Sequence, residues 1–457
     1  MWDLKIDTRR LVEGFSTSVP WDRPNVLWNK ADDWWNDNYV TDSNTAAFLS
    51  ATGIIDPNKQ NYINNLVIAL KNQGIWNKAK AIYPFVSEQR NLLNYTEDFS
   101  NAYWVGSPTR TVNTTVAPNS TATADTIVFS TSSQLYNVSA RSQEIYTFSV
   151  YVKKETNRYF SIQLETSLVA FRGIFDLDTA TVTNTSPNTS AQIIDAGGGW
   201  FRVSVTNTTA DSILYTTFSA ASSGTSVVSG SGTFYLWGAQ LELGSTATDY
   251  QVTINAQEQF AAAYKYNLKD PQDTDAAFRL KIFGTWTFTP TGAKPNGTNA
   301  YMDTNMPSNT MSNGSTHLSY YSRTDSAANS IEMGTESPDF LLWYKAFGFT
   351  RANFGVSMDY LPVLSNTKGF LLGSRYTSTN GLIQFNSNQQ LKTGLSGDSR
   401  STLKIYLGAL NASGTSANYY SSKQTAFATI GDGLNDAEAA ALYTIVQQFQ
   451  TSMARQV

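Results

Sequence analysis

The spacing of hydrophobic and polar positions predicts short helices over residues 43–85. An apolar stripe at helical spacing is formed there by Ile63, Leu66, Val67 and Leu70. Asp56 before Pro57 supplies an N-cap and a first-turn residue, and Gly74 stands where a helix commonly ends in a left-handed residue. The stretch AIYPFV (residues 81–86) is predicted to be a last helical turn that its proline stops. Such a unit buries too little surface to be stable alone.

Between about residues 90 and 253 the apolar positions alternate with polar ones, as in strands with one buried face. In IYTFSVYVKK one face is formed by Tyr146, Phe148, Val150 and Val152. In FYLWGAQLEL the same rule predicts one continuous apolar face of Tyr235, Trp237, Ala239, Leu241 and Leu243. Turn-forming clusters such as SPNTS and DAGGGW separate these runs. The pattern predicts a β-sandwich or jelly roll of about 160 residues.

A second alternating region follows over residues 264–431, and the chain then closes with a predicted helix. Asn435 and Glu438 have the spacing of a capping box. The buried stripe of that helix is predicted to be Leu442, Ile445, Val446, Phe449 and Met453. The fold class is therefore mainly β, with two β-sandwich or jelly-roll domains, a small N-terminal helical unit and a C-terminal helix.

The first 40 residues show no periodicity, but they are rich in tryptophan. We predict an extended arm whose aromatic side chains dock into a partner, because aromatics give a large contact area at a low entropy cost. An arm packed on its own protein is the alternative. The candidate docking residues are Trp2, Trp21, Trp28, Trp34 and Trp35.

Composition excludes several classes of function. Charged residues make up 15% of the 457 residues and the net charge is -4, so no basic stripe exists for nucleic acid. No apolar run is long enough to span a membrane, and the first residues do not resemble a secretory signal. Cysteine is absent, although the composition is that of an extracellular β protein. A virion component built in a bacterial cytosol and released by lysis would combine these features, as would a secreted protein whose signal has been removed.

Five blocks in the middle of the chain carry a family resemblance. They are NLLNYTEDFSNAYW, YTFSVYVKK, FDLDTATV, GGGWFRVSVT and FYLWGAQLELGSTATDY, in that order over residues 91–250. Together they resemble a module common in tailed-phage structural proteins. The resemblance implies a jelly roll similar to carbohydrate-binding modules.

The flanking segments resemble phage fibre or spike-type proteins. They are AAFLSATGIIDPNKQNYINNLVIALKNQGIWNKAKAIYPFV, YKYNLKDPQDTDAAFRL and AFATIGDGLNDAEAAALYTIVQQFQTSMARQV. The last is similar to the end of a concanavalin-like sandwich. The resemblance implies four segments: an arm at 1–40, a helical unit at 41–87, an inserted jelly roll at 88–255, and a concanavalin- or laminin-G-like sandwich with its terminal helix at 256–457. Insertion at an exposed loop is physically cheap.

No catalytic constellation stands out from the sequence. Glu97 and Asp98 are adjacent and would point to opposite faces of a strand, so they are assigned to a turn. The E-x-D-x-x-E motif of concanavalin-like glucanases is absent. The sole histidine, His317, has no G-x-S-x-G motif beside it, and alternation predicts that it lies on a polar surface face. A carboxylate pair from distant strands, as in depolymerases, stays open.

The sequence predicts no cofactor and no metal. Calcium stays open at three aspartate pairs, because Asp is a hard oxygen ligand, but turn formation is its commoner role. No EF-hand spacing accompanies them. The pairs are Asp176/Asp178, Asp273/Asp275 and Asp432/Asp436.

Exposed aromatic rings beside polar side chains would bind sugar. Trp104, Trp200 and Trp237 lie in the recurring blocks of the jelly roll and are assigned to core packing. The candidate carbohydrate-binding residues are Trp343, Tyr344 and Tyr321. If Trp343 and Tyr344 lie on one strand, they face opposite sides and at most one is exposed.

The hypothesis from sequence is a non-enzymatic phage virion protein of the fibre, spike or decoration type. Its N-terminal region would attach it to other virion proteins, and its sandwiches would bind host-surface polysaccharide. The resemblance to fibres implies a homotrimer on the particle surface. The alternatives are a polysaccharide depolymerase and a purely structural capsid, collar or tail component.

Overall fold

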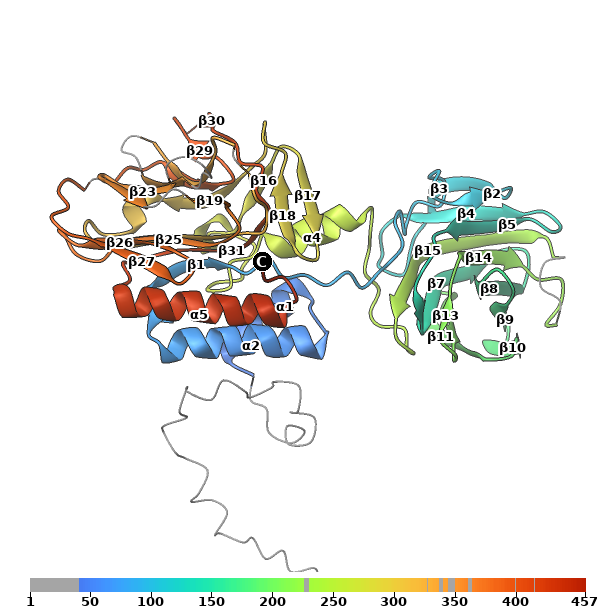
Figure 1. The fold of residues 1–457 in the computed structure, drawn as a ribbon. Helices are drawn as coiled ribbons and strands as arrows, with labels where there is room; N and C mark the ends of the chain where they lie inside the picture. Colours follow the sequence, from blue (N-terminus) through green and yellow to red (C-terminus); the bar gives the residue numbers. More distant parts are fainter. Residues whose placement is uncertain are drawn as a thin grey trace, which may run out of the picture. The chain divides into compact units, whose positions relative to one another are not determined.

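The computed structural model describes residues 41–225, 230–326, 328–336, 340–343, 350–360, 364–398, 400–414 and 416–457. The predicted arm at residues 1–40, with its five tryptophans, lies outside the described residues. The described chain is mainly β, as predicted, and its strands form two sandwiches (Figure 1).

The first sandwich, within residues 91–255, has two antiparallel sheets of six strands in the described part of the chain. One sheet has the order β10–β9–β8–β14–β5–β2, with β2 at Val105–Gly106, β5 at Gln134–Val138, β8 at Tyr159–Glu165, β9 at Ala170–Asp176, β10 at Thr181–Thr185 and β14 at Tyr215–Ala220. The other has the order β11–β12–β7–β15–β4–β3, with β3 at Thr109–Thr115, β4 at Ala124–Phe129, β7 at Tyr146–Lys154, β11 at Thr189–Gly197, β12 at Trp200–Asn207 and β15 at Gly232–Leu243. A separate two-stranded sheet pairs β6 (Gln143–Glu144), which precedes β7 in the sequence, with β13 (Asp211–Ser212), which precedes β14.

Aromatic side chains fill the space between these two sheets. Trp104 is 1% exposed and its indole N–H donates to the Tyr95 carbonyl, so the prediction that it packs in the core is confirmed. Phe218 contacts the ring of Phe148 from the opposite sheet and the ring of Phe160 from the neighbouring strand of its own sheet. The predicted core face of β7 is confirmed as well, because its four alternating apolar residues all lie in this cluster.

The second sandwich is built from both flanks of the first. Its eight-stranded sheet, counted over the described residues, has the order β17–β18–β31–β20–β25–β26–β27, with β1 also on β31. These strands are β1 at Ala79–Tyr83, β17 at Trp286–Thr289, β18 at Gly292–Pro295, β20 at Thr316–Ser322, β25 at Gly369–Arg375, β26 at Gly381–Phe385, β27 at Asn388–Lys392 and β31 at Thr425–Gly431.

The facing sheet has nine strands in the described residues, in the order β16–β19–β28–β21–β22–β23–β24, with β29 and β30 beside β21. They are β16 at Lys281–Phe283, β19 at Tyr301–Pro307, β21 at Ile331–Thr335, β22 at Phe340–Trp343, β23 at Thr350–Phe354, β24 at Ser357–Tyr360, β28 at Lys404–Leu407, β29 at Leu410–Asn411 and β30 at Ala417–Asn418. Two short 3-10 helices, η3 at Asp275–Ala277 and η4 at Ser308–Thr310, lie in the connections.

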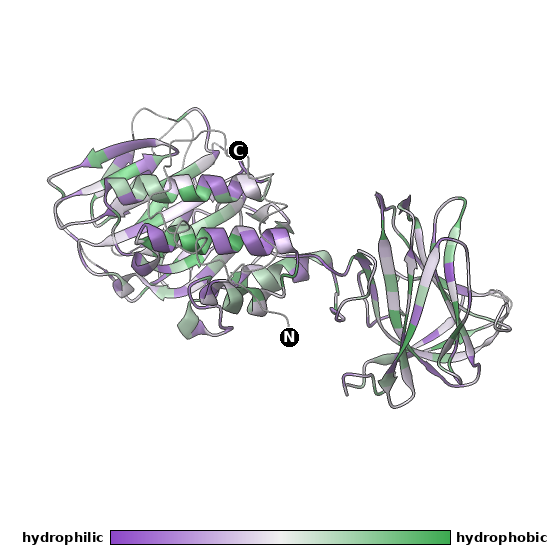
Figure 2. Cartoon of the chain, turned by 90° about the horizontal axis from the view of Figure 1, so that it is seen from below, coloured by the Kyte–Doolittle hydropathy of each residue, from purple (hydrophilic) through white to green (hydrophobic). Residues whose placement is uncertain are grey.

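Helices cover the outer face of the eight-stranded sheet (Figures 1 and 2). They are α1 (Ser43–Thr52), α2 (Pro57–Asn72) and α5 (Asp436–Ser452), and α2 and α5 lie side by side. Their apolar stripes are buried as predicted, apart from the half-buried Met453. The Asp56 cap and the capping box of Asn435 and Glu438 are confirmed. No helix among the described residues is long and apolar enough to cross a membrane.

The helical turn predicted at AIYPFV is wrong. After the single turn of α3 (Ile75–Lys78), the chain enters β1, which pairs antiparallel with β31, for example Ala81 with Ile430. Tyr83 is buried between the sheets and Ile82 is buried under the helices. Burial on both faces of a sheet hides the alternation that marks a strand. A strand before the first sandwich and a strand near the C-terminus therefore share one sheet, although the predicted domain bounds stay predictions.

The continuous apolar face predicted for β15 is also wrong. The pairing of β15 with β7 shifts register between Trp237 and Gln240, around Gly238, whose φ is +64°. This is a β-bulge, and it moves the residues after it to the other face. The core receives Phe234, Leu236, Ala239 and Leu241, while the outer face carries Tyr235, Trp237, Gln240 and Glu242.

A buried arginine joins the C-terminus to the point where the chain leaves the second sandwich. Arg455 is 0% exposed, and its guanidinium donates to the carbonyls of Phe85 at 2.7 Å, Pro84 at 3.1 Å and Ala426 at 3.3 Å. It also lies over the ring of Phe449. Burial lowers its pKa to about 10.

We predict that Arg455→Ala lowers the free energy of unfolding of the second sandwich by about 3 kcal/mol, because buried carbonyls lose their donor and a cavity opens. Arg279→Ala is the matched control. Arg279 pairs with Asp273 and Asp275 in a partly exposed network that solvent screens, so its loss should destabilise the sandwich much less than the loss of Arg455. Denaturant unfolding of the two variants measures the difference, and equal losses would contradict the role given to Arg455.

Candidate functional site

The bulge at Gly238 places aromatic side chains on the outer face of the first sandwich. Trp237 of β15 lies directly opposite Tyr151 of β7, and their ring centroids are 5.2 Å apart. Tyr250, which follows β15, packs on Trp237 at 4.6 Å. These rings belong to a small cluster that is separate from the core between the sheets. The outer face of this sheet is therefore partly apolar at this point.

Residues 244–252 return across this face and are held there by polar side chains. Glu242, which is buried, accepts hydrogen bonds from the Thr248 amide at 3.0 Å and the Thr248 hydroxyl at 2.5 Å. Gln240 accepts from the Gln251 amide at 2.7 Å, and Arg202 donates to the Thr248 carbonyl at 2.6 Å. These bonds anchor Thr248 and Gln251, and they thereby fix the position of Tyr250 between them.

Glycine is required at position 238 for two reasons. The backbone at this position is in the left-handed conformation, which is strained for any residue with a Cβ. In addition, a Cβ would lie 3.1 Å from the Tyr151 ring and 3.3 Å from the Tyr250 ring. Gly238 thus allows both rings to approach the sheet.

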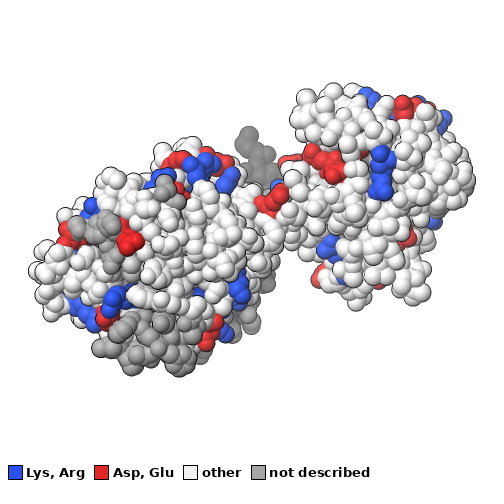
Figure 3. All heavy atoms as spheres, turned by 90° about the horizontal axis from the view of Figure 1, so that it is seen from above, with Lys and Arg blue, Asp and Glu red and all other residues white. Residues whose placement is uncertain are grey.

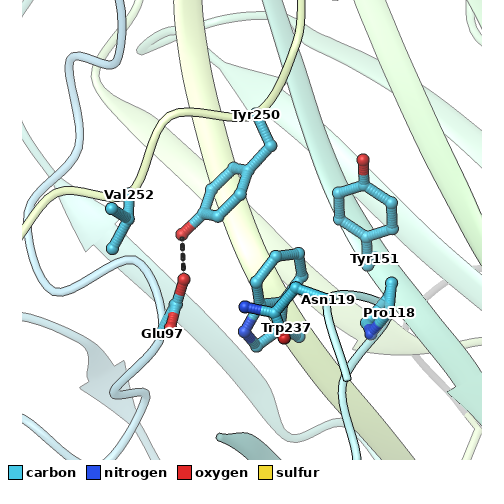
Figure 4. A pocket seen from close by; sticks show the side chains of 7 residues that line it. All are labelled: Glu97, Pro118, Asn119, Tyr151, Trp237, Tyr250 and Val252. Carbon is cyan, nitrogen blue, oxygen red and sulfur yellow. Dashed lines mark hydrogen bonds between the residues drawn. The ribbon is translucent and has the colours of Figure 1, made fainter. Parts of the chain in front are cut away.

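A hollow of about 420 Å³ opens over this cluster. Figure 4 shows Glu97 and Tyr151 on opposite sides of it, with Trp237 between them. The remaining lining residues are Pro118, Asn119, Tyr250 and Val252. Trp237 is only 4% exposed and its indole N–H donates to Thr123, so it forms the floor. The half-buried rings of Tyr151 and Tyr250 form the accessible walls.

The carboxylate of Glu97 faces into this hollow. It accepts a hydrogen bond from the Tyr250 hydroxyl at 3.2 Å (Figure 4). Burial raises the pKa of Glu97, and hydrogen bonds from Tyr250, Trp237 and Thr123 oppose that rise. Burial and the charge of Glu97 in turn raise the pKa of Tyr250. Tyr250 therefore stays protonated and keeps its hydroxyl as a donor.

Glu97 and Asp98 both lie in the turn predicted for them, which the Asp98 amide closes by donating to the Tyr95 carbonyl. The sequence did not indicate that the Glu97 side chain also lines the hollow. Asp98 accepts from the amide and the hydroxyl of Ser100 within a turn. Nearby Asp125 is fully buried and accepts from the Phe99 and Asn113 amides. Burial raises the pKa of Asp125 to about 6 despite these two bonds. The three carboxylates thus have separate environments, and of these three only Glu97 lines the hollow.

Of the three residues predicted to bind sugar, the two that the structure describes lie on different sheets. Trp343 is half-buried at the end of β22 and packs against Ile331, Leu341 and Leu410. Tyr344 lies outside the described residues. Tyr321 is fully buried beneath the helices, and its hydroxyl accepts from the Val457 amide, so its ring offers no face to a ligand.

The predicted surface position of His317 is wrong. Its ring is fully buried, with Nδ1 2.6 Å from the Asp432 carbonyl oxygen and Nε2 3.1 Å from the Thr429 hydroxyl. Burial lowers its pKa to about 4. The reason is that helices cover the outer face of this sheet, so neither face of β20 meets solvent. Both ring nitrogens of His317 therefore have hydrogen-bond partners inside the protein, and the ring is not accessible to a ligand.

Cationic side chains pair with both members of two aspartate pairs and with Asp432 of the third. Arg158 and Lys154 bind Asp176 and Asp178. Asp273 and Asp275 pair with Lys265, Arg279 and Lys281, and Asp432 pairs with Lys80. Within the described ranges no three His, Asp or Glu side chains gather as a metal site. Figure 3 shows one face on which charged side chains lie in small separate groups.

Sequence reasoning missed Tyr151, Tyr250 and Glu97 as members of one site. One signal was present: a glycine inside an alternating strand pattern commonly marks a bulge. Applied at Gly238, that rule would have moved Trp237 to the outer face. Nothing local in the sequence indicates that residues 97 and 250 meet, because that contact depends on the return segment.

Comparisons with known proteins give structural likeness only. No protein-family model and no curated protein matches the chain. Among solved structures, the enzymatically active domain of tailspike protein 4 of bacteriophage CBA120 is similar at 13% identity and a TM-score of 0.23, covering 34% of this chain and 21% of that one. This chain thus spans about a fifth of the length of the tailspike structure.

Two further structures are similar at the same level. Domains LG4-5 of the mouse laminin alpha1 chain match at 11% identity and a TM-score of 0.23, covering 64% of this chain and 84% of that one. The CBM22-1–CBM22-2 tandem of Xyn10C from Paenibacillus barcinonensis matches at 10% identity and a TM-score of 0.22, covering 76% and 98%. At these TM-scores the likenesses carry no argument about function.

We predict that Gly238→Ala destabilises the first sandwich by about 2–3 kcal/mol, because left-handed strain adds to the displacement of two rings. Gly198→Ala is the control, since Gly198 has φ +62° and a Cβ there would meet no atom within 4 Å. That variant should pay only the strain of about 1 kcal/mol. Denaturant unfolding compares them, and an equal effect of both substitutions would refute the close approach at Gly238.

Proposed function

We propose that the first sandwich binds carbohydrate at the hollow formed by Tyr151, Tyr250, Trp237 and Glu97, and that the chain is a non-enzymatic virion protein that displays this site. One observation carries the binding proposal. Two half-buried tyrosine rings and one carboxylate converge on an open hollow, held by a hydrogen-bonded return segment. Few convergent polar groups on an apolar concave surface are typical of a ligand site.

The chemistry of the hollow suits a sugar. The C–H faces of a pyranose ring can pack on the accessible rings of Tyr151 and Tyr250. Its hydroxyls can donate to Glu97 and bond to the exposed Asn119 side chain, which also lines the hollow. Burial strengthens the hydrogen bond that Glu97 can accept, because the local dielectric is low.

The proposed site binds a carbohydrate and does not hydrolyse it. Hydrolysis of a glycosidic bond uses two carboxylates that are about 5–10 Å apart across the sugar. Glu97 is the single carboxylate among the described lining residues. Asp125 is fully buried and already accepts two amides, and Asp98 is engaged in its turn. This arrangement supports a binding site, and a depolymerase with a dispersed carboxylate pair is the second candidate.

The virion part of the proposal rests on the sequence resemblance to phage fibre and spike-type proteins. The N-terminal region would attach the chain to other virion proteins, and the sandwiches would face host-surface polysaccharide. A homotrimer, made in the bacterial cytoplasm and exposed on the particle, is the expected state. A purely structural capsid, collar or tail component is the alternative that binds no sugar.

We predict that the whole chain binds host-type glycans on an array and that Tyr151→Ala and Glu97→Gln each weaken the strongest interaction about tenfold. Affinity should also fall as the pH drops through the raised pKa of Glu97, because protonation removes an acceptor. Titration calorimetry measures both effects. Tyr136→Ala is the matched control, since Tyr136 is a half-buried tyrosine on β5 of the other sheet.

Three results would contradict parts of this proposal. Unchanged affinity of both variants would place the ligand elsewhere. Release of oligosaccharide from host capsule or lipopolysaccharide by the wild-type chain would favour the depolymerase. A blank array at high protein concentration would favour the purely structural alternative.

We predict that antibody-labelled electron microscopy finds the chain on the outside of intact particles. Light scattering should give the mass of a trimer. A strict monomer that is absent from purified particles would contradict the virion assignment while leaving the glycan site to its own test.

A further inference from the structure

A second hollow of about 330 Å³ adjoins the first, and Pro118 lines both. The two hollows lie over neighbouring rows of the same sheet face. Trp237 pairs with Tyr151 in one row, and Trp200 pairs with Lys153 in the next. Two residues along β7 separate the rows, which is about 7 Å. The hollows are therefore close enough to hold neighbouring units of one chain-like ligand.

The second hollow is open to solvent above an aromatic floor. Trp200 is 3% exposed, and its indole N–H donates to the Val116 carbonyl at 3.1 Å. The rim is formed by Gly197 at the end of β11 and by Gly198 and Gly199 in the β11–β12 turn, and all three have positive φ. A Cβ at Gly197 or Gly198 would meet no atom within 4 Å, so space is free above this turn.

The charged residue of the second hollow is a lysine. The Lys153 ammonium donates to the Gly198 carbonyl at 2.8 Å, and its stem lies beside Gly199. No carboxylate of the described residues lies within 4.0 Å of that nitrogen. An ammonium has three N–H donors, so donors remain for a ligand.

The two hollows thus carry opposite charges on either side of Pro118. Glu97 would repel an anionic sugar from the first hollow, and Lys153 would attract one to the second. Resting on the proposed function, we propose that the hollows are consecutive subsites for an acidic polysaccharide. A neutral unit occupies the hollow of Glu97, and a carboxylate-bearing unit occupies the hollow of Lys153 and Trp200. The charge contrast fixes the direction in which the polysaccharide lies.

The test uses oligosaccharides of hyaluronan and unsulfated chondroitin, in which neutral and carboxylate-bearing units alternate. Each is used before and after carboxyl reduction, which changes charge with little change of shape. The wild-type chain should bind the acidic form of at least one probe about tenfold more tightly at low salt, and salt should reduce that preference. Lys153→Met should bind both forms of that probe equally, whereas Lys153→Arg should keep the preference. Lys154→Met is the matched control, because Lys154 pairs with Asp178 and lies outside both hollows.

Calorimetry separates the outcomes. Equal binding of acidic and reduced forms by the wild type, or a preference that persists in Lys153→Met, overturns the acidic subsite and leaves the proposed function intact. No binding of either form, when the glycan array is positive, also overturns the subsite alone. A blank array together with no binding overturns both. Loss of binding in Lys153→Arg as well as Lys153→Met would show a packing role for Lys153 and would also overturn the subsite.

Discussion

The close approach of two tyrosine rings to Gly238 is the constraint on which the candidate site depends. The bulge there divides β15 into two halves with opposite facing. Its first half sends Trp237 outward, and its second half sends Gln240 and Glu242 outward. The polar pair then holds the return segment that carries Tyr250. Without the register shift, Trp237 and the anchors of the return segment could not share one face.

The same return segment gives the hollow its electrostatic character. Tyr250 covers Glu97 from one side and donates to it, so the carboxylate is partly removed from water without a cationic partner in the described residues. Such a group is costly to bury unless other donors reach it. A sugar hydroxyl would supply a further donor. The burial of Glu97 leaves its carboxylate short of donors, and the open hollow gives a polyol ligand access to it; both features therefore favour such a ligand.

The second sandwich is built from two segments of the chain, one before and one after the first sandwich, and contacts between these segments must hold it together. The pairing of β1 with β31 and the bonds of Arg455 to the Phe85 and Pro84 carbonyls join segments that are more than 300 positions apart in sequence. These contacts fix the position of residues 79–85, after which the chain leaves the second sandwich for the first. Helices α2 and α5 close the sheet on its outer face. This scaffold accounts for the buried environments of His317 and Tyr321 without any ligand.

The sequence was sufficient for features that depend on local rules. Helix caps at Asp56 and Asn435 and the alternation in β7 follow from neighbouring residues, and each is confirmed. The errors arose where a distant segment decides the environment. The first three residues of AIYPFV belong to a strand because β31 lies beside them, and His317 is buried because helices cover its sheet. The site depends on both kinds of information: the bulge has a local signal in Gly238, but the meeting of Glu97 with Tyr250 has none.

A crystal structure of the whole chain with the glycan that binds most strongly on an array would show whether the hollow of Glu97 is the sugar site. We expect a sugar ring to pack against the accessible parts of the Tyr151 and Tyr250 rings, which contact each other edge to face, with a hydroxyl in hydrogen-bond contact with Glu97. A glycan bound elsewhere, for example beside Trp343, with the hollow of Glu97 left empty, would contradict it.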